Sequence, residues 1–515
     1  MDVLGFCFFW LLSIGFSFIP ERFIKPTSPT ISTNMILMQS SLVSLLFLAV
    51  TLIVQRPIFA FLAVSIFLII LCGVSNAKLR ALKEPMVFSD IAMFSQAFTH
   101  PRLYFPFLGL APVILMPLII IALIYAVLTL EPAMAFTWNR ISITVLLIII
   151  CFVAAKILAE KFTLSEDPAT DNRDYGLLNA LFAYAIQASS DKHKQQIRDT
   201  LKQSPFMVSG NQNKTPPTFL PHFNKQSAQN ITVIQSESFF DARRMHDSIN
   251  NDVLKHFDTC LKESSQFGKL SVPAWGANTM RTEFSFLTGL KYEDMGLYRY
   301  YPYQFLHKMP VVSLAKLLQS QGYHCVCIHP HPASFFGRDR IFPQLGFDEF
   351  IDIQHFDTTK TFGPYISDQA ITDKILEVSE KYNNKPLFIF AITMENHGPL
   401  HLEKTTNNEQ QSYYSKAPMK QINDLTVYLR HLKNADSMIE QLTTAFNKSD
   451  KANTLCFYGD HIPSMPNIYQ ELAYTDKDSD YFIWNNGKLK QQPKQSNISV
   501  DNLAITLLKQ TGNVG

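Results

Sequence analysis

Five long apolar stretches occupy most of the first 160 residues of this chain and limit what it can fold into. They cover 4–20, 36–54, 58–75, 107–130 and 141–158, and the one charged residue inside them, Lys156, lies near an end. Each has about the 20 residues that an α-helix needs to cross the hydrocarbon core of a bilayer. We therefore expect a polytopic α-helical membrane domain with five spans over residues 1–160.

A cleaved signal peptide is the alternative interpretation of residues 1–20. This stretch lacks the basic start and the small-residue cleavage site of such peptides, so we expect it to remain as a span. Trp10, Tyr104 and Trp138 lie near proposed span boundaries, where aromatic residues gather at the membrane interface. The net charge of +2 does not indicate nucleic acid as a partner.

Residues 161–228 are typical of a connector. Helical periodicity over 172–203 predicts an amphipathic helix that either lies at the membrane interface or packs on the next domain. A loop rich in proline and asparagine follows it. The seven cysteines of the chain show neither a C-x-x-C motif nor a zinc spacing, so we expect them to be small buried side chains.

From residue 229 onward, short apolar runs alternate with longer helical patterns. We expect buried strands at 231–238, 323–330, 387–397 and 454–461, and helices at 311–322, 366–383 and 422–446. Continuous apolar strands separated by helices are typical of a parallel sheet with helices on both faces. The fold predicted for residues 229–515 is therefore an α/β domain with a mainly parallel central sheet.

Each predicted strand ends in a side chain able to bind a metal ion or a phosphate. These side chains belong to Glu237, His329, His397 and the adjacent pair Asp460 and His461. We expect them to meet, because the ligand crevice of an open α/β sheet lies outside the carboxyl ends of its strands. The two carboxylates and the imidazole of Glu237, Asp460 and His461 suit Mn²⁺, Zn²⁺ or Mg²⁺. Each residue alone is equally explained as part of a turn or a helix start, so their shared position is what favours a metal site.

The stretch WGANTMRTEFSFLTGL, residues 275–290, offers a nucleophile. It passes from a turn of small residues into a helical pattern, and Thr279 lies near the helix start, where backbone N–H groups favour a phosphate. A hydroxyl bound to a metal there is competent to attack phosphorus. Thr279 could instead be a helix cap, and Thr282 and Ser285 are competing hydroxyls.

Two further motifs carry groups that bind phosphate. HPHPASFFGRDRIF contains His329, His331 and Arg338, and an arginine can clamp a phosphate with two hydrogen bonds. A solvated loop in which Arg338 pairs with a nearby aspartate is the alternative. In ENHGP, His397 follows a strand at a turn, where it could protonate a leaving alkoxide.

Five motifs, taken in chain order, resemble those of the lipoteichoic acid synthase and phosphoglycerol transferase branch of the sulfatase and alkaline phosphatase superfamily: VIQSES, GANTMRTEFSFLTG, HPHPASFFGRD, TMENHGP and FYGDHIP. That family also has five N-terminal spans followed by an extracytoplasmic domain. The resemblance implies one divalent ion, usually manganese, with the ligands Glu237, Thr279, Asp460 and His461. It implies that Thr279 is the nucleophile, and that the phosphate and glycerol of the substrate are contacted by His329, Phe336, Arg338 and His397.

The resemblance implies a transferase in the bacterial inner membrane, with its catalytic domain outside the cytoplasm. Such an enzyme moves a glycerol-phosphate headgroup from phosphatidylglycerol, a membrane phospholipid, through a phospho-threonine intermediate to a glycan, lipid or polymer acceptor. The basic residues that flank the spans, taken alone, place the large domain in the cytoplasm. We prefer the layout of the family, because lysines in interfacial loops mislead such a count.

The sequence departs from the family pattern at two positions, and these leave the headgroup open. Phe336 stands where relatives often have tryptophan, and His331 where they have an acidic residue. Phosphoethanolamine transferases are the nearest alternative, but they typically depend on several disulfides, which the four cysteines after residue 229 fit poorly. Neither C-x-P-x-R nor S-x-P-x-R occurs, so we do not expect sulfate-ester hydrolysis. The complete Glu, Thr, Asp and His set argues against a non-catalytic membrane binding protein.

Overall fold

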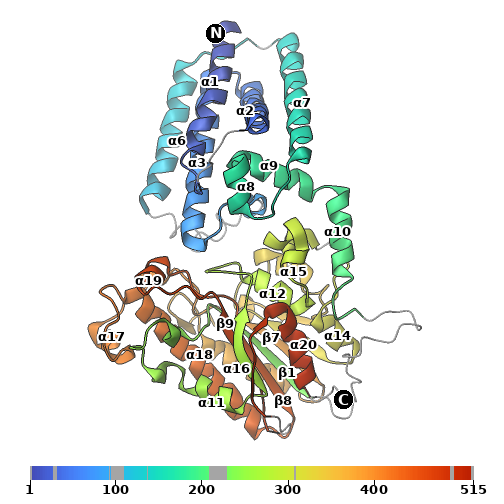
Figure 1. Ribbon diagram of the computed structural model, residues 1–515, viewed down its shortest axis with the longest axis vertical. Helices are drawn as coiled ribbons and strands as arrows, with labels where there is room; N and C mark the ends of the chain where they lie inside the picture. The colour runs from blue at the N-terminus through green and yellow to red at the C-terminus, as the bar shows by residue number, and fades with distance from the viewer. Residues whose placement is uncertain are drawn as a thin grey trace, which may run out of the picture. The chain divides into compact units, whose positions relative to one another are not determined.

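The computed structural model describes residues 3–26, 32–91, 93, 110–135, 137–207, 229–306, 309–487 and 492–511. The chain separates into two compact units, Met1–Gln195 and Gln196–Gly515 (Figure 1). The division falls inside the stretch 161–228 that the sequence marks as a connector.

The apolar stretches of the first unit form helices. Their bounds are Val3–Glu21 for α1, Thr33–Val54 for α2, Pro57–Leu82 for α3, Leu110–Leu130 for α6 and Trp138–Lys161 for α7. Among the residues that the structure describes, four of these, α1, α2, α3 and α7, are long and apolar enough to cross a membrane. The apolar N-terminal helices are thus confirmed, while the count of five spans stays a prediction.

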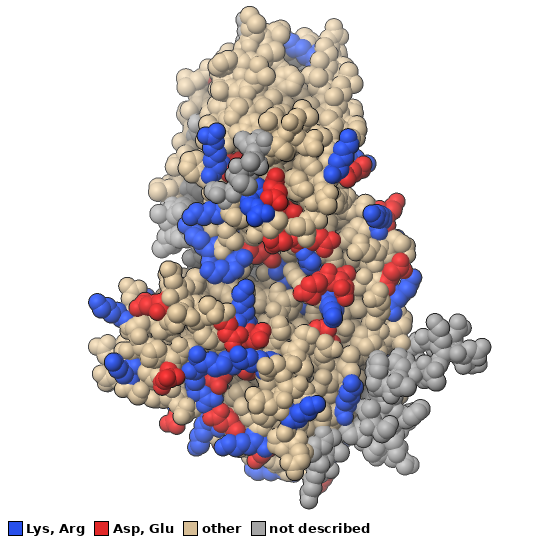
Figure 2. Space-filling view, in the orientation of Figure 1, with Lys and Arg blue, Asp and Glu red and all other residues tan. Residues whose placement is uncertain are grey.

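Large apolar side chains are exposed along these helices. Ile53 at the end of α2 is 82% exposed and Leu11 of α1 is 67% exposed. On the face drawn in Figure 2, the upper part of the view carries few charged side chains. A water-soluble domain rarely exposes so much apolar surface, whereas a surface that faces lipid requires it.

The stretch predicted as one helix over 172–203 is three shorter helices, α8 (Pro168–Tyr175), α9 (Leu177–Ala188) and α10 (Asp191–Leu201). Gly176 separates the first two with a φ of 83°, and a Cβ there would lie 2.9 Å from Met35 Cε. The Glu21 carboxylate then accepts the N–H groups of Leu177 and Leu178 at 3.0 and 3.4 Å and starts α9 anew. The hydrophobic periodicity of a sequence does not reveal a helix boundary that involves a single residue such as Gly176.

The second unit is built on a nine-stranded sheet with the order β10-β2-β9-β8-β1-β7-β3-β4, in which β11 also pairs with β2. The strands are β1 (Asn230–Ser236), β2 (Gln266–Ser271), β3 (His324–Ile328), β4 (Glu349–Ile351), β7 (Leu387–Ile392), β8 (Asn453–Gly459), β9 (Ser479–Asn485), β10 (Lys494–Gln495) and β11 (Ile498–Ser499). The central strands β8, β1, β7, β3 and β4 are parallel, and β9 is antiparallel to β8 and β2. The mainly parallel sheet and its four predicted strands are confirmed.

Helices cover both faces of this sheet (Figure 1). One face carries α11 (Lys255–Glu263), α16 (Asp368–Lys381) and α18 (Asn423–Lys448), and the other carries α12 (Thr279–Thr288), α14 (Leu314–Ser320) and α20 (Val500–Gln510). Ile389 of β7 belongs to the first core, while the next residue, Phe390, stacks on Phe286 of α12 with ring centroids 5.7 Å apart. Successive strand residues thus fill opposite cores. The helices predicted at 311–322, 366–383 and 422–446 are α14, α16 and α18.

The remaining elements of this unit are short. They are α13 (Pro302–Leu306), α15 (Arg338–Ile341), α17 (Asn407–Tyr413), α19 (Pro466–Glu471) and a hairpin of β5 (Thr361–Phe362) and β6 (Tyr365–Ile366). The described residues also form six 3₁₀ helices, Ala242–Met245, Asn251–Leu254, Glu293–Tyr300, Phe335–Gly337, Ile353–His355 and Leu400–Leu402. All seven cysteines of the chain are free, and the four in this unit are buried. The interpretation as small buried side chains is thus confirmed for these four and for Cys72, whereas Cys7 and Cys151 are only partly buried.

Candidate active site

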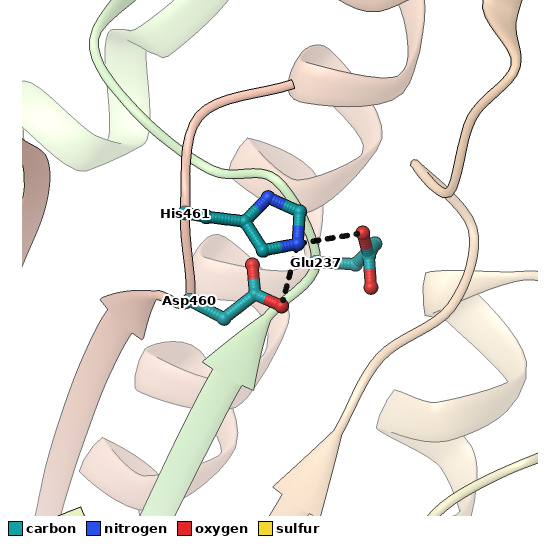
Figure 3. Close-up of side chains that lie close together, drawn as sticks. All are labelled: Glu237, Asp460 and His461. Carbon is teal, nitrogen blue, oxygen red and sulfur yellow. Dashed lines mark ion pairs between the residues drawn. The ribbon is translucent and has the colours of Figure 1, made fainter. Parts of the chain in front are cut away.

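Glu237 and Asp460 leave two neighbouring strands at the same level. β1 and β8 are parallel and Ser236 pairs with Gly459, so the residue after each is a carboxylate. The Nε2 atom of His461 lies 3.7 Å from Glu237 Oε1 and 3.4 Å from Asp460 Oδ2 (Figure 3). All three side chains are buried, and one ligand atom from each lies within 4.8 Å of the others. The predicted cluster is therefore assembled, with a spacing that one metal ion can bridge.

Close approach of two chain segments explains the glycine before Asp460. A Cβ on Gly459 would lie 1.8 Å from the carbonyl oxygen of Phe239, so only glycine lets the chain after β1 pass here. In that passing chain, the Ser238 N–H donates to Asp460 Oδ1 at 2.8 Å and the Ser238 hydroxyl donates to Glu237 Oε1 at 2.9 Å. These two bonds fix the orientation of both carboxylates.

Two buried ligand atoms of the cluster, Asp460 Oδ2 and His461 Nε2, have no hydrogen-bond partner in the described part of the chain. His461 Nδ1 lies 3.0 Å from the Ile462 carbonyl oxygen, which can only accept, so Nδ1 carries the proton and Nε2 presents its lone pair. Buried acceptors that face one another without a donor cost free energy unless a cation binds between them. The oxygen and nitrogen donors fit a divalent ion, and Mn²⁺, Zn²⁺ and Mg²⁺ all suit this set.

Electrostatics at Glu237 support the same interpretation. Burial first, and the charge of Asp460 second, raise the pKa of Glu237 to about 8. Without a metal the Glu237 carboxyl therefore holds a proton at neutral pH. A divalent ion would offset both carboxylate charges and release that proton.

The start of α12 lies at this cluster. The Thr282 hydroxyl donates to the Asp460 carbonyl oxygen at 2.7 Å, and the Gly276 N–H donates to the Ile462 carbonyl oxygen at 3.0 Å. Thr279, the first residue of α12, precedes Thr282 by three residues and so lies on the same side of the helix. These two bonds hold the start of α12, which Thr279 begins, against the segment that follows β8.

Exposure distinguishes the three hydroxyls that the sequence left open. Thr282 and Ser285 are buried, at 0% and 1% exposure, and the Thr282 hydroxyl is already engaged with Asp460. Thr279 is partly exposed. Of the three, Thr279 is the hydroxyl that a substrate can reach.

Arg338, predicted to clamp the substrate phosphate, faces a protein carboxylate. It is 1% exposed, and it donates from Nη2 to Glu283 Oε2 at 2.8 Å and from Nη1 to His329 Nε2 at 3.2 Å. His329 Nδ1 lies 3.2 Å from the Ile392 carbonyl oxygen, so this imidazole is neutral with its proton on Nδ1. Burial, and then the charge of Arg338, hold the pKa of His329 well below its usual value. His329 and Arg338 lie together, and Glu283, which sequence reasoning missed, is the third member of their group.

Phe336 has a left-handed backbone with a φ of 58°, a conformation that is strained for a bulky residue. The Cζ atom of Arg338 lies 5.2 Å from the centroid of its ring, and the Tyr301 ring meets it at 5.8 Å. Such strain persists only where surrounding contacts impose it, and it is typical of functional sites. Phe336 thus packs on the Arg338 guanidinium.

His397 lies after β7 and is partly exposed. Its Nδ1 donates to the Gly398 carbonyl oxygen at 2.7 Å, and the Tyr365 hydroxyl lies 3.4 Å from the same nitrogen. Burial lowers the pKa of His397, so the imidazole is neutral at pH 7 and its Nε2 lone pair is the reactive position. In this form His397 accepts a proton.

Two residues before His397, Glu395 enters a buried charge network that sequence reasoning also missed. His431 Nδ1 donates to Glu395 Oε1 at 3.0 Å, and His431 Nε2 donates to Glu403 Oε1 at 2.8 Å. Arg430 Nη2 donates to Glu403 Oε2 at 2.7 Å. The available signal was a histidine on the buried face of the helix α18. With both ring nitrogens donating, His431 is an imidazolium.

The His431 network predicts how stability depends on pH. Burial alone would lower the pKa of His431, but its hydrogen bonds to Glu395 and Glu403 outweigh burial and raise that pKa from 6.5 to about 9. The resulting stabilisation, about 3 kcal/mol, is complete below about pH 6.5 and is lost as pH rises through about 9. We expect His431→Gln to lower the thermal unfolding midpoint strongly near pH 6 and only slightly near pH 10, as measured by calorimetry. A deficit that stays equal at both pH values would contradict the imidazolium assignment.

The mainly parallel sheet, with a buried carboxylate and histidine cluster outside the carboxyl ends of its strands, defines a class of α/β enzymes that bind their ligands at this edge. A family model gives the particular family. The model described as Sulfatase matches residues 229–513, and the chain belongs to the sulfatase family. It is therefore an enzyme of the sulfatase family, which is the family that the motifs predict.

Individual relatives are distant. The chain is 26% identical over 503 residues to the capsular polysaccharide biosynthesis protein RkpI of Rhizobium meliloti, across 92% of this chain and 88% of that protein. It is 24% identical over 151 residues to lipoteichoic acid synthase 1 of Bacillus subtilis, across 28% of this chain and 22% of that protein. Among solved structures, the Streptococcus pyogenes phosphoglycerol transferase GacH, in complex with sn-glycerol-1-phosphate, is 22% identical with a TM-score of 0.47, across 62% of this chain and 79% of that one.

Proposed function

We propose that this protein is a membrane-anchored transferase that moves a glycerol-phosphate headgroup from phosphatidylglycerol to a hydroxyl of a glycan, lipid or polymer acceptor. The observation that carries the proposal is the buried Glu237, Asp460 and His461 cluster next to the helix α12, whose first residue is the partly exposed Thr279. Four apolar helices support a lipid donor, because anchoring raises the effective concentration of the enzyme at the membrane. The name of the relative RkpI favours a polysaccharide as acceptor.

The metal site would consist of Glu237, Thr279, Asp460 and His461, with Mn²⁺ as the first choice and Zn²⁺ or Mg²⁺ as alternatives. A bound divalent ion would polarise a phosphoryl oxygen and lower the pKa of the threonine hydroxyl. The helix start at Thr279 adds backbone N–H groups that favour an incoming phosphate.

The transfer proceeds in two steps. Thr279 Oγ1 forms a bond to the donor phosphorus as the bond from phosphorus to the diacylglycerol oxygen breaks. The proton of the threonine hydroxyl passes through the neutral His397 to that oxygen, and diacylglycerol leaves. The acceptor hydroxyl then attacks the phospho-threonine and the Oγ1–P bond breaks. The neutral His397 takes the acceptor proton on Nε2 and passes it to Thr279 Oγ1, so that both residues return to their starting forms. Arg338 binds phosphoryl oxygens and Phe336 contacts the glycerol. His329, whose ring nitrogens are both engaged, holds Arg338.

Identifying the lipid consumed tests this proposal. Full-length protein in nanodiscs, supplied with Mn²⁺ and with headgroup-labelled phosphatidylglycerol or phosphatidylethanolamine, is assayed for diacylglycerol. We expect release from phosphatidylglycerol alone. Release from phosphatidylethanolamine alone would make the protein a phosphoethanolamine transferase. Release from neither lipid by a metal-loaded protein would favour a non-catalytic binding role.

We further propose that the protein lies in the bacterial inner membrane, with the second unit outside the cytoplasm, where such acceptors are built. Reporters fused to the C-terminus test this, since alkaline phosphatase is active outside the cytoplasm and a fluorescent protein inside it. Activity of the cytoplasmic reporter alone would overturn this placement. The flanking basic residues would then report the orientation correctly.

A further inference from the structure

Glu283 and Arg338 form a fully buried ion pair, with exposures of 0% and 1%. The contact is two-pronged: Arg338 Nε lies 3.2 Å from each carboxylate oxygen of Glu283, and Nη2 donates to Oε2 at 2.8 Å. The Tyr303 hydroxyl donates to Oε1 at 2.6 Å. Both oxygens of the Glu283 carboxylate thus accept hydrogen bonds from protein donors, and this buried group does not itself contact a substrate.

The pair joins three elements that each carry a proposed site residue. Glu283 lies on α12, four residues after Thr279 and on the same side of the helix. Arg338 begins α15, and its Nη1 holds His329, just after β3, at 3.2 Å. Glu283 therefore connects the helix of the proposed nucleophile to the proposed phosphate-binding group through a single side chain.

Burial makes this partner necessary for Arg338. A guanidinium without a counter-charge at this depth is strongly unfavourable, and a paired one needs good geometry to offset its lost hydration. Without Glu283, the guanidinium would lose the partner that fixes its present orientation.

The contacts leave Arg338 with unused donors. Nε is shared between the two Glu283 oxygens, one N–H of Nη2 meets Glu283, and one N–H of Nη1 meets His329. Among the residues that the structure describes, one N–H on each terminal nitrogen has no acceptor. Because Nε and Nη2 are both fixed, the plane of the guanidinium is fixed, and so are the directions of these two N–H groups.

We propose that Glu283 is a positioning residue for the transfer: it holds the Arg338 guanidinium so that its unused N–H groups point to the phosphoryl oxygens, and it acts only through Arg338. This inference rests on the proposed transfer reaction. Glu283→Gln keeps the size of the side chain and one oxygen acceptor but removes the charge and one acceptor. We expect kcat to fall about 10²-fold, the cost of misplacing a group that contacts the reacting centre.

A double-mutant cycle on kcat/KM tests the route of this effect. If Glu283 acts through Arg338, adding Glu283→Gln to Arg338→Lys lowers kcat/KM less than about 3-fold further. If the separate losses multiply, Glu283 acts by another route and the proposal is overturned. Full activity of Glu283→Gln alone would overturn it as well.

Asp436→Asn is the matched control. Asp436 is also a buried carboxylate, but it accepts backbone N–H groups of His256 and Phe257, at 3.0 and 2.7 Å, at the start of α11. Its loss is expected to lower the unfolding midpoint and leave kcat in place. Should Glu283→Gln fail to fold, Tyr303→Phe removes only the 2.6 Å bond to Glu283 and enters the same cycle with Arg338→Lys. If Tyr303→Phe lowers kcat as much in the Arg338→Lys variant as it does in the wild type, the proposal is refuted.

Phosphate binding keeps this test separate from the proposed function. Inorganic phosphate is titrated calorimetrically into full-length, Mn²⁺-loaded Thr279→Ala and into Thr279→Ala with Glu283→Gln. We expect about 10-fold weaker binding in the double variant, even if neither lipid proves to be a donor. Equal affinities would overturn the positioning role, whereas failure of the lipid assay alone would overturn only the donor.

Discussion

Thr279→Ala is expected to lower kcat by about 10⁴-fold or more, because no other reachable hydroxyl of α12 can take over as nucleophile. Thr282 and Ser285 are buried, and the Thr282 hydroxyl is engaged with the Asp460 carbonyl oxygen at 2.7 Å. Thr279 is partly exposed and begins the helix, so its loss is expected to change the free energy of unfolding by less than about 1 kcal/mol. Metal would still bind through the three remaining side chains.

Two further variants distinguish a nucleophilic role of Thr279 from a structural one. Thr279→Ser keeps a hydroxyl and should retain measurable turnover, whereas Ser285→Ala should match the wild type in turnover. Incubating the wild type with phosphatidylglycerol in the absence of an acceptor should leave a glycerol-phosphate adduct on the Thr279 peptide, visible by mass spectrometry. Full metal-dependent turnover by Thr279→Ala would remove the phospho-threonine step from the mechanism.

The convergence at the sheet edge could be predicted because one physical rule governs it. Parallel strands place their carboxyl ends at one edge, so polar residues that follow separate apolar runs must meet. Glu237 and Asp460, 223 positions apart, do meet next to His461. No comparable rule predicts β9 (Ser479–Asn485), the antiparallel neighbour of β8, because its sequence shows only a short apolar run beside charged residues. Its side chains are buried by the helices on the sheet, since Phe482 and Trp484 belong to the same core as Phe257 of α11.

Charged partners across the fold were beyond sequence reasoning. Arg338 was expected to bind a phosphate or a nearby aspartate, but its main partner is Glu283, 55 positions earlier on α12. Sequence pattern shows which side chains are charged and not which of them meet, because that depends on how α12 and α15 pack. His431 escaped notice for the same reason, since its partners Glu395 and Glu403 come from a loop far along the chain.

Asp460→Asn is expected to have the second large effect. Asparagine keeps the Oδ1 atom that accepts the Ser238 N–H at 2.8 Å. It replaces Oδ2, which has no hydrogen-bond partner in the described part of the chain, by an uncharged donor. A donor cannot serve as a metal ligand at that position, so metal affinity should fall at least about 10²-fold and turnover should fall with it.

The stability of this variant should change in opposite directions without and with metal. In the metal-free protein, the buried Asp460 carboxylate helps to raise the pKa of Glu237 to about 8. Removing one of two neighbouring buried charges relieves this cost, so metal-free Asp460→Asn should unfold at or above the wild-type temperature. With metal at about 100 times its Kd, the wild type gains about 2.7 kcal/mol and the variant gains almost nothing.

The pH dependence distinguishes a metal site from carboxylates that merely pair with His461. Because the folded pKa of Glu237 lies above its usual 4.5, the stability it contributes to the metal-free protein is complete below about pH 4.5 and is lost as pH rises through about 8. Metal requires the ionised carboxylate, so the midpoint rise caused by Mn²⁺ should grow over the same interval. Scanning fluorimetry in EDTA and in Mn²⁺, near pH 6 and pH 8.5, measures both trends. An equal metal-induced rise in wild type and Asp460→Asn, or a rise that shrinks with increasing pH, would mean that Glu237 and Asp460 do not hold the ion, and Thr279 would then need another activator.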